Sequence, residues 1–228
     1  MAYWVLKAVL TPVLLLLWRV RVEGREHVPR RGAAVLAANH QSFCDSFFIP
    51  LVIARRVTFV AKAEYFDSWR TAWFFRAAGQ IPIRRDDGDA SQRALDTATG
   101  VLARGKLLGI YPEGTRAPDG RLYRGRTGAA RLAVATGAPV VPVALVGTRS
   151  IQPPGRRLMR PFHTVTVRFG PPLVAEPADG ADPMALRAFT ERLMAAIAEL
   201  SGQERVDVYA SEARGRLAAP AVAGTDVS

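Results

Sequence analysis

Short apolar runs alternate with longer helical patterns along most of this sequence, and that alternation restricts the fold more than any other feature. The apolar runs predict strands at 33–38, 57–61, 80–84, 107–111, 140–146 and 164–169. The patterns between and after them predict helices at 44–54, 64–78, 91–103, 127–136 and 183–200. Strands separated by helices favour an α/β fold, in which a largely parallel mixed sheet is flanked by helices.

Size and composition indicate one compact unit. The chain has 228 residues, 49% of them apolar, which is enough for one sizeable core but short for two ordinary domains. We expect a globular domain at 21–200, a separate apolar helix at 1–20 before it, and a flexible tail rich in Ala and Gly at 201–228. The single cysteine excludes an internal disulfide framework and a cysteine-based zinc site.

The N-terminal segment has the composition of a membrane-surface helix. Residues 3–18 are mostly apolar with tryptophans near both ends, and five arginines follow within 19–31. The segment is shorter than the roughly 20 residues of a bilayer span and contains Lys7 and Pro12. We therefore expect it to lie on a membrane surface with anionic lipid, peripheral or monotopic on the cytoplasmic face of the cell membrane. An amphipathic helix of the core is the alternative.

Arginine dominates the charge of this protein. The net charge is +11, and 28 of the 31 basic residues are arginines, whose planar guanidinium binds phosphate through paired hydrogen bonds. Residues 176–228 are net acidic, and the sequence contains no recognition-helix signature, aromatic RNA-binding motif or paired Cys/His ligands. The pattern indicates a phosphate-bearing partner, and we do not expect that partner to be nucleic acid.

The segment at 39–45 follows a predicted strand and opens a predicted helix. Histidine has the side-chain pKa nearest neutral pH, and a carboxylate on one ring nitrogen fixes its tautomer and stabilises the imidazolium. With His40 in the loop, Ser42 as the helix N-cap and Asp45 in the first turn, the carboxylate can reach the imidazole. The same residues also fit a capping box, in which Asp45 only accepts backbone N–H groups and His40 is structural.

Charged residues also follow other predicted strands. Residues 111–116, YPEGTR, place Gly114 and Arg116 where an anion can approach the backbone. Residues 79–85, GQIPIRR, end in two arginines, which the aspartates that follow can also pair. Each segment by itself is also typical of a surface turn. Residues 139–143, PVVPV, indicate ordinary strand packing.

Cys44 lies four residues from His40, so a thiolate nucleophile is one hypothesis. A lone cysteine in an apolar helix is more often a packing residue. The sequence contains no Gly-x-Ser-x-Gly elbow, and serine hydrolase chemistry is therefore not predicted.

Taken in order, NHQSFCD, GQIPIRR, YPEGTR and APVVPV resemble the glycerolipid acyltransferases, specifically the 1-acyl-sn-glycerol-3-phosphate (lysophosphatidate) acyltransferase type. The resemblance covers roughly residues 20–170, including the basic link YRGRTGAARLAVATGAPVVPV, and the ordered set is more specific than any single motif. It implies transfer of a fatty acyl group from acyl-CoA or acyl carrier protein to the free hydroxyl of 1-acyl-sn-glycerol-3-phosphate. The product is phosphatidic acid, in phospholipid biosynthesis at a membrane.

The resemblance also implies roles for individual residues. It makes His40 the general base and Asp45 its orienting partner, with no covalent acyl-enzyme. It assigns the acceptor phosphate to a larger set, namely Lys62, Arg84, Arg85, Glu113, Gly114, Thr115 and Arg116. Within this set Arg116 is the main ligand and Glu113 has a positioning role. It implies no metal and no cofactor, with acyl-CoA or acyl carrier protein as co-substrate.

Three other functions fit parts of the sequence. An acyltransferase of the same fold can use a different lysophospholipid or an amino-lipid as acceptor. A hydrolase would release free fatty acid. A non-catalytic basic protein would bind anionic membranes or nucleic acid with strong salt dependence and no turnover, but it leaves the pairing of His40 with Asp45 unexplained.

Overall fold

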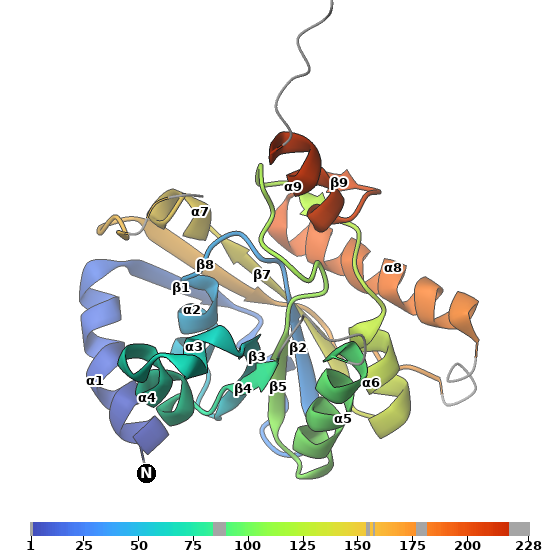
Figure 1. Cartoon of the computed structure of the whole chain (residues 1–228), viewed down its shortest axis with the longest axis horizontal. Coiled ribbons are helices and arrows are strands. Elements are labelled where there is room, and N and C mark those ends of the chain that lie inside the picture. Colours follow the sequence, from blue (N-terminus) through green and yellow to red (C-terminus); the bar gives the residue numbers. More distant parts are fainter. Residues whose placement is uncertain (1, 84–89, 154–155, 157, 177–181, 219–228) are drawn as a thin grey trace, which may run out of the picture.

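A seven-stranded sheet forms the centre of the molecule (Figure 1). The structure is a computed structural model that describes residues 2–83, 90–153, 156, 158–176 and 182–218. The strand order is β1-β8-β7-β2-β5-β3-β4, and a separate small sheet pairs β6 with β9. The strands are β1 (Arg19–Glu23), β2 (Ala34–Ala38), β3 (Val57–Lys62), β4 (Ile81–Ile83), β5 (Leu107–Ile110), β6 (Leu122–Tyr123), β7 (Val140–Val146), β8 (Thr164–Phe169) and β9 (Arg205–Val206).

Most neighbouring strands run parallel, as the sequence predicts. Among the described strands, only the pairing of β7 with β8 is antiparallel. Strand β2 lies between β5 and β7, and its Ala37 is opposite Ile110 of β5. The residues that follow β2 and β5 therefore meet at one edge of the sheet, where α/β folds place their binding sites.

Helices cover both faces of the sheet. Figure 1 shows α1 to α4 on one side, and α5, α6 and α8 on the other. The helices are α1 (Ala2–Leu17), α2 (Asp45–Val52), α3 (Glu64–Asp67), α4 (Trp69–Ala77), α5 (Ala90–Ala103), α6 (Gly128–Thr136), α7 (Thr148–Ile151), α8 (Pro183–Ser201) and α9 (Ala210–Ala218), with a 3-10 turn at Arg25–His27.

Two buried apolar clusters, one on each face, attach these helices to the sheet. Successive residues of a strand point to opposite faces, so that Val35 joins the cluster with α6 and α8 while Leu36 joins the cluster with α2. Phe48 of α2 and Leu193 of α8 are each almost fully buried in their clusters. Burial of a side chain of this size contributes about 1.5–3 kcal/mol, so β2 is anchored from both sides.

The predicted elements are present, but one helix is divided, and the sequence did not predict β1, β6, α7, β9 or α9. The helix predicted at 64–78 is divided into α3 and α4, because Ser68 has an extended backbone (φ −91°, ψ 126°). Strand β1 was not predicted, because its sequence RVRVE is mostly exposed and contains no apolar run; it pairs with β8 along its length. The other predicted strands and helices end within two residues of the predicted positions.

The prediction of a flexible tail at 201–228 is wrong for the part that contains β9 and α9. Strand β9 pairs with β6, and Arg214 of α9 donates a hydrogen bond to an earlier loop. Tyr123 and Ala210 belong to a third buried cluster beneath this segment. Residues 219–228 lie outside the described residues.

The predicted N-terminal helix is present as α1, with one face on the core. Tyr3 is buried, Leu14 and Leu17 pack on the α2 cluster, and Lys7 donates to the carbonyl of Pro50 at 2.7 Å. Its other side chains include six large exposed apolar ones: Trp4, Val5, Val9, Val13, Leu15 and Leu16. Within the described part of the protein, no helix combines the length and the apolar character that crossing a bilayer requires.

Candidate active site

The carboxyl ends of β2 and β5 bring two of the sequence motifs into contact. His40 comes two residues after β2, and Glu113 comes three residues after β5. The backbone N–H of His40 donates to Oε1 of Glu113 at 2.9 Å. The backbone carbonyl of His40 accepts from the N–H of Ala117 at 2.8 Å. The backbone of His40 is therefore held on both sides by the loop that follows β5.

The imidazole of His40 contacts the carboxylate of Asp45, at 2.9 Å from Nδ1 to Oδ2. The same oxygen accepts the N–H groups of Gln41 at 2.7 Å and of Ser42 at 2.8 Å. The side chain of Asp45 is fully buried, whereas that of His40 is 17% exposed. The tautomer with hydrogen on Nδ1 fits this contact and leaves Nε2 as the ring nitrogen that can meet a substrate.

This contact arises from a local structure that differs from the prediction. Helix α2 begins at Asp45 with Cys44 as its N-cap residue, so Ser42 is not the N-cap. Ser42 is buried, and its hydroxyl donates to the carbonyl of Gln152 at 3.2 Å. One oxygen of Asp45 contacts both backbone N–H groups and the imidazole of His40. Asp45 therefore accepts backbone N–H groups, as the capping interpretation states, and also pairs with His40.

Aromatic rings fix the plane of the His40 imidazole. The ring stacks on Tyr111, with centroids 3.9 Å apart and planes at 11°. Tyr111 stacks in turn on Phe59 at 5.5 Å, and its hydroxyl is 2.9 Å from Oγ of Ser46. Burial holds the pKa of Tyr111 well above its ordinary value, and the charge of Asp45 raises it further. Tyr111 is therefore a neutral support for the imidazole and not a base.

Glu113 is a buried carboxylate that holds the backbone. It is only 1% exposed, and its Oε2 accepts the N–H of Tyr123 at 3.0 Å while Oε1 accepts that of His40. Burial raises the pKa of Glu113 to about 7, although these two N–H contacts act in the opposite direction. Because both oxygens already face backbone donors, Glu113 does not belong with the phosphate ligands; it positions His40.

Two residues that the sequence does not single out also hold this region. The side-chain amide of Asn39 accepts the N–H of Leu145 at 2.7 Å and donates to Oε1 of Gln203 at 2.6 Å. Gln203 donates in turn to the carbonyl of Gly120 at 2.6 Å. The segment after α8 thus joins β7, the residue before His40 and the loop after β5. The only signal for Asn39 is its place beside His40, and the sequence offers none for Gln203.

The motif after β5 combines a tight turn with an exposed arginine. Gly114 has a φ of +72°, in the left-handed region that favours glycine. A Cβ atom at this position would lie 3.1 Å from Nε of Arg126, so glycine also makes room for that side chain. Thr115 is partly buried, and Arg116 is exposed. The turn therefore presents Arg116 to solvent within four residues of the buried Glu113.

The remaining predicted phosphate ligands follow β3 and β4. These strands pair in parallel with Lys62 opposite Ile83, so their carboxyl ends lie beside each other. Because β3 also pairs in parallel with β5, Lys62 ends its strand toward the same edge of the sheet as His40. Arg84 and Arg85 come directly after Ile83 and lie outside the described residues.

Cys44 is a packing residue. It is fully buried, its Sγ lies 3.2 Å from Oγ of Ser42, and burial raises the pKa of its thiol to about 12. A cysteine nucleophile requires a lowered pKa and access to the substrate. The hypothesis that Cys44 is the nucleophile is therefore wrong.

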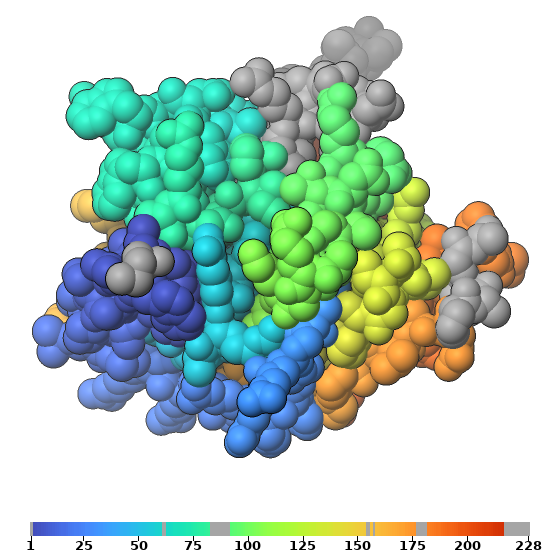
Figure 2. All heavy atoms as spheres, turned by 90° about the horizontal axis from the view of Figure 1, so that it is seen from below, coloured from blue at the N-terminus to red at the C-terminus, as the bar shows by residue number. Residues whose placement is uncertain are grey.

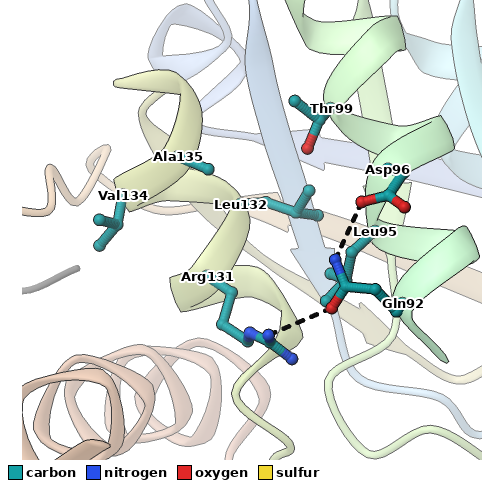
Figure 3. A pocket seen from close by; sticks show the side chains of 8 residues that line it. All are labelled: Gln92, Leu95, Asp96, Thr99, Arg131, Leu132, Val134 and Ala135. Carbon is teal, nitrogen blue, oxygen red and sulfur yellow. Dashed lines mark hydrogen bonds between the residues drawn. The ribbon is translucent and has the colours of Figure 1, made fainter. Parts of the chain in front are cut away.

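A hollow of about 520 Å³ lies between α5 and α6, away from these residues (Figure 3). Gln92 donates to Asp96 at 2.9 Å and accepts from Arg131 at 3.3 Å, so these polar side chains of the hollow pair with one another. None of its lining residues is a predicted site residue. In the ranges that the structure describes, no three His, Cys, Asp or Glu side chains gather as metal ligands would. The candidate active site is therefore the edge of the sheet at His40.

Known proteins resemble this one over most of its length. The Acyltransferase family model matches residues 19–146. The 1-acyl-sn-glycerol-3-phosphate acyltransferase LPAT1, chloroplastic, of Arabidopsis thaliana is 32% identical over 71% of this chain and 46% of that protein. The 1-acyl-sn-glycerol-3-phosphate acyltransferase alpha of Mus musculus is 29% identical over 69% of this chain and 56% of that protein. The chain spans about half the length of these curated relatives.

A solved structure has the same fold. The crystal structure of PlsC, the 1-acyl-sn-glycerophosphate (LPA) acyltransferase from Thermotoga maritima, aligns with a TM-score of 0.65 at 27% identity, over 85% of this chain and 76% of that one. The region that the family model matches contains His40, Asp45 and Arg116. Sequence motifs, fold and the matched region agree, and the chain belongs to the Acyltransferase family.

Proposed function

We propose that this protein transfers a fatty acyl group to the free hydroxyl of 1-acyl-sn-glycerol-3-phosphate and so makes phosphatidic acid for phospholipid synthesis. The contact between His40 and the buried Asp45 carries the proposal, because it engages Nδ1 of the imidazole while the side chain of His40 stays partly exposed. The names of the relatives support this acceptor. The donor is a thioester, acyl-CoA or acyl carrier protein, and no cofactor takes part.

In the proposed reaction, Nε2 of His40 takes the proton of the acceptor hydroxyl while the oxygen attacks the carbonyl carbon of the thioester. The imidazolium is stabilised by Asp45 at Nδ1. When the tetrahedral intermediate collapses, the C–S bond breaks, and the imidazolium gives its proton to the leaving thiolate. The acyl group passes directly between the substrates, and the burial and raised pKa of Cys44 support this direct route.

The contacts around His40 support its role as the base. Tyr111 fixes the plane of the ring, and Glu113 fixes the backbone that carries it. A positioned general base contributes about 10²–10⁴-fold in rate. Further acceleration comes from holding the acceptor oxygen against the thioester carbon, because alignment of two reactants lowers the entropic part of the barrier.

The acceptor phosphate anchors the second substrate in this proposal. Each charge-assisted hydrogen bond to a phosphate contributes about 1.5–3 kcal/mol, so a few arginines suffice. Arg116 is supported as the main ligand by its exposure and by Ala117, the next residue, which binds the backbone of His40. The residues proposed to assist Arg116 are Lys62, Arg84, Arg85, Gly114 and Thr115.

We also propose that the protein docks on the cytoplasmic face of the cell membrane as a peripheral or monotopic protein. Helices α1 and α4 contact each other, and Figure 2 shows α1 (dark blue) beside the teal segment that contains α4. Trp4 and Val9 of α1, and Trp69 and Trp73 of α4, are all about half exposed or more. Tryptophan and aliphatic side chains favour the lipid interface, and the net charge of +11 favours anionic lipid.

Release of free thiol tests the proposed function. Purified protein is incubated with lysophosphatidate and acyl-CoA, and the lipid products are separated by thin-layer chromatography. We expect thiol release with formation of phosphatidic acid, a loss of about 10²–10⁴-fold in kcat/KM for His40→Ala, and near-normal activity for Cys44→Ala.

Each alternative predicts a different result in this assay. Free fatty acid in place of phosphatidic acid would identify a hydrolase. Equal turnover of an acceptor that lacks the phosphate monoester would refute the proposed acceptor. Normal activity of His40→Ala would refute the mechanism.

A further inference from the structure

Three arginines in or against the loop after β5 have no carboxylate partner among the described residues. Within the described residues, Arg116, Arg126 and Arg214 form no salt bridge. The neighbouring Arg121 and Arg124, in contrast, pair with aspartates at 2.7 Å and 3.6 Å. Positive side chains that are close together and not neutralised indicate a site for an anion.

Arg126 is held against the turn at Gly114 from two sides. Its backbone N–H donates to the carbonyl of Pro112 at 2.8 Å, and its Nε lies where a Cβ on Gly114 would be 3.1 Å away. The guanidinium lies over the ring of Tyr209, 5.0 Å from the centroid, and donates to Oγ of Ser211 at 3.3 Å. Because the ring and the hydroxyl are both neutral, these contacts orient the guanidinium and leave its positive charge uncompensated.

Arg214 brings a second positive charge to Arg116. Its Nη2 donates to the carbonyl of Arg116 at 2.6 Å. The pKa of Arg214 is lowered, mainly by burial and also by the positive charge of Arg116. Two guanidinium groups that repel each other in this way are unfavourable without an anion, and a bound anion would offset the repulsion.

The cluster adjoins the catalytic histidine. Arg116 directly precedes Ala117, whose N–H binds the carbonyl of His40, and Gly114 directly follows Glu113, which binds the N–H of His40. A ligand held by Arg116 is therefore bound to the loop that positions the base, and Arg126 and Arg214 both donate to backbone carbonyls of that loop. A phosphate monoester fits such a cluster, because it carries close to two negative charges and accepts several hydrogen bonds.

We propose that Arg126 and Arg214 bind the phosphate of the acceptor together with Arg116, so that α9 contributes a residue to the active site. This inference rests on the proposed function. Arg214 lies outside residues 19–146, which the family model matches, and no motif in the sequence predicts its role. Because the thioester donors also contain phosphate, the experiment must separate the acceptor phosphate from that of the donor.

Binding and kinetic measurements on single variants distinguish the acceptor phosphate from the donor phosphate. Arg126→Gln and Arg214→Gln are compared with Arg216→Gln, an exposed arginine of α9 that lies two positions and thus about 200° from Arg214 around the helix. Binding of glycerol 3-phosphate is measured by titration calorimetry, which requires no turnover. KM is then measured separately for lysophosphatidate and for acyl-CoA, and thermal unfolding shows whether each variant is folded.

We expect each of the two variants to weaken glycerol 3-phosphate binding and to raise KM for lysophosphatidate by about 10-fold or more, with KM for acyl-CoA unchanged. Arg216→Gln should stay within about two-fold of wild type in all three quantities. If Arg126→Gln unfolds, Arg126→Lys keeps the charge but loses the planar fork, and it should also weaken binding.

Two results would overturn the inference. The first is wild-type binding of glycerol 3-phosphate by folded Arg126→Gln and Arg214→Gln. The second is a rise in KM for acyl-CoA alone, which would place the donor phosphate at the cluster. Absence of turnover in the wild type, with binding of glycerol 3-phosphate that depends on both arginines, would instead refute the proposed function and leave the anion site intact.

Discussion

The buried carboxyl of Glu113 makes the stability of this protein depend on pH. Burial raises its pKa from an ordinary value of 4.5 to about 7 in the folded state. Below pH 4.5 the group is protonated in both the folded and unfolded states, and above pH 7 it is ionised in both. Between these values the unfolded state ionises first, so the free energy of unfolding falls as the pH rises. The total loss is on the order of 3 kcal/mol.

Urea unfolding of the wild type and of Glu113→Gln at several pH values from about 4.5 to about 8 measures this effect. The variant cannot ionise at this position, so its stability relative to the wild type should increase by about 3 kcal/mol from the lowest to the highest pH. Its amide also turns N–H groups toward backbone donors, which costs about 1–3 kcal/mol at every pH. The pH-dependent part of the difference is therefore the quantity to compare.

A matched control is Glu199→Gln, which changes an exposed glutamate of α8. Its stability relative to the wild type should not vary with pH by more than a few tenths of a kcal/mol. A difference between wild type and Glu113→Gln that is constant with pH would refute the reasoning from burial. A difference of the opposite sign would mean that the backbone N–H groups outweigh the cost of burying the charge.

Three further predictions concern the site and the membrane. Asp45→Asn removes the charge that stabilises the imidazolium of His40, so kcat should fall about 10³–10⁴-fold with a normal fold by circular dichroism; a loss smaller than about threefold would remove Asp45 from the mechanism. Gly109→Ala would place a Cβ 2.3 Å from the ring of Phe59, so we expect urea unfolding to show a loss of about 1–3 kcal/mol, and wild-type stability would contradict the packing of β5. Trp69→Ser should weaken sedimentation with phosphatidylglycerol vesicles several-fold whereas Trp69→Phe should not; equal binding of both variants would exclude α4 from the membrane contact.

Local patterns predicted most of the central sheet and the contact of His40 with Asp45. Strands β2 and β7 are buried almost along their whole length, so their sequences are continuous apolar runs that are easily recognised. The contact of His40 with Asp45 joins residues five positions apart, and spacing alone indicated it. The N-cap was predicted incorrectly at Ser42, because a capping box and a loop that turns back on a buried carboxylate have the same sequence signature.

Long-range contacts account for most of what the sequence did not predict. Strand β1 is ordered by pairing with β8, from Arg19 opposite Thr164 onward, and its own sequence alternates arginine with valine. Helix α9 contains few apolar residues and is held through Ala210 and through polar contacts of Arg214. Gln203 connects Asn39 with Gly120 through a single amide, which no periodicity or spacing can reveal.

The connection through Gln203 also sets an order in which this region can be completed while the polypeptide is being made. His40 and Asp45 leave the ribosome early, whereas Gln203 and Arg214 are among the last described residues to be added. A nascent polypeptide can fold its N-terminal part first, but its loop at Gly120 lacks the amide of Gln203 until that residue emerges. We therefore expect fragments that end before Gln203 to form the contact of His40 with Asp45 while their loop at Gly120 stays less ordered than in the longer chain.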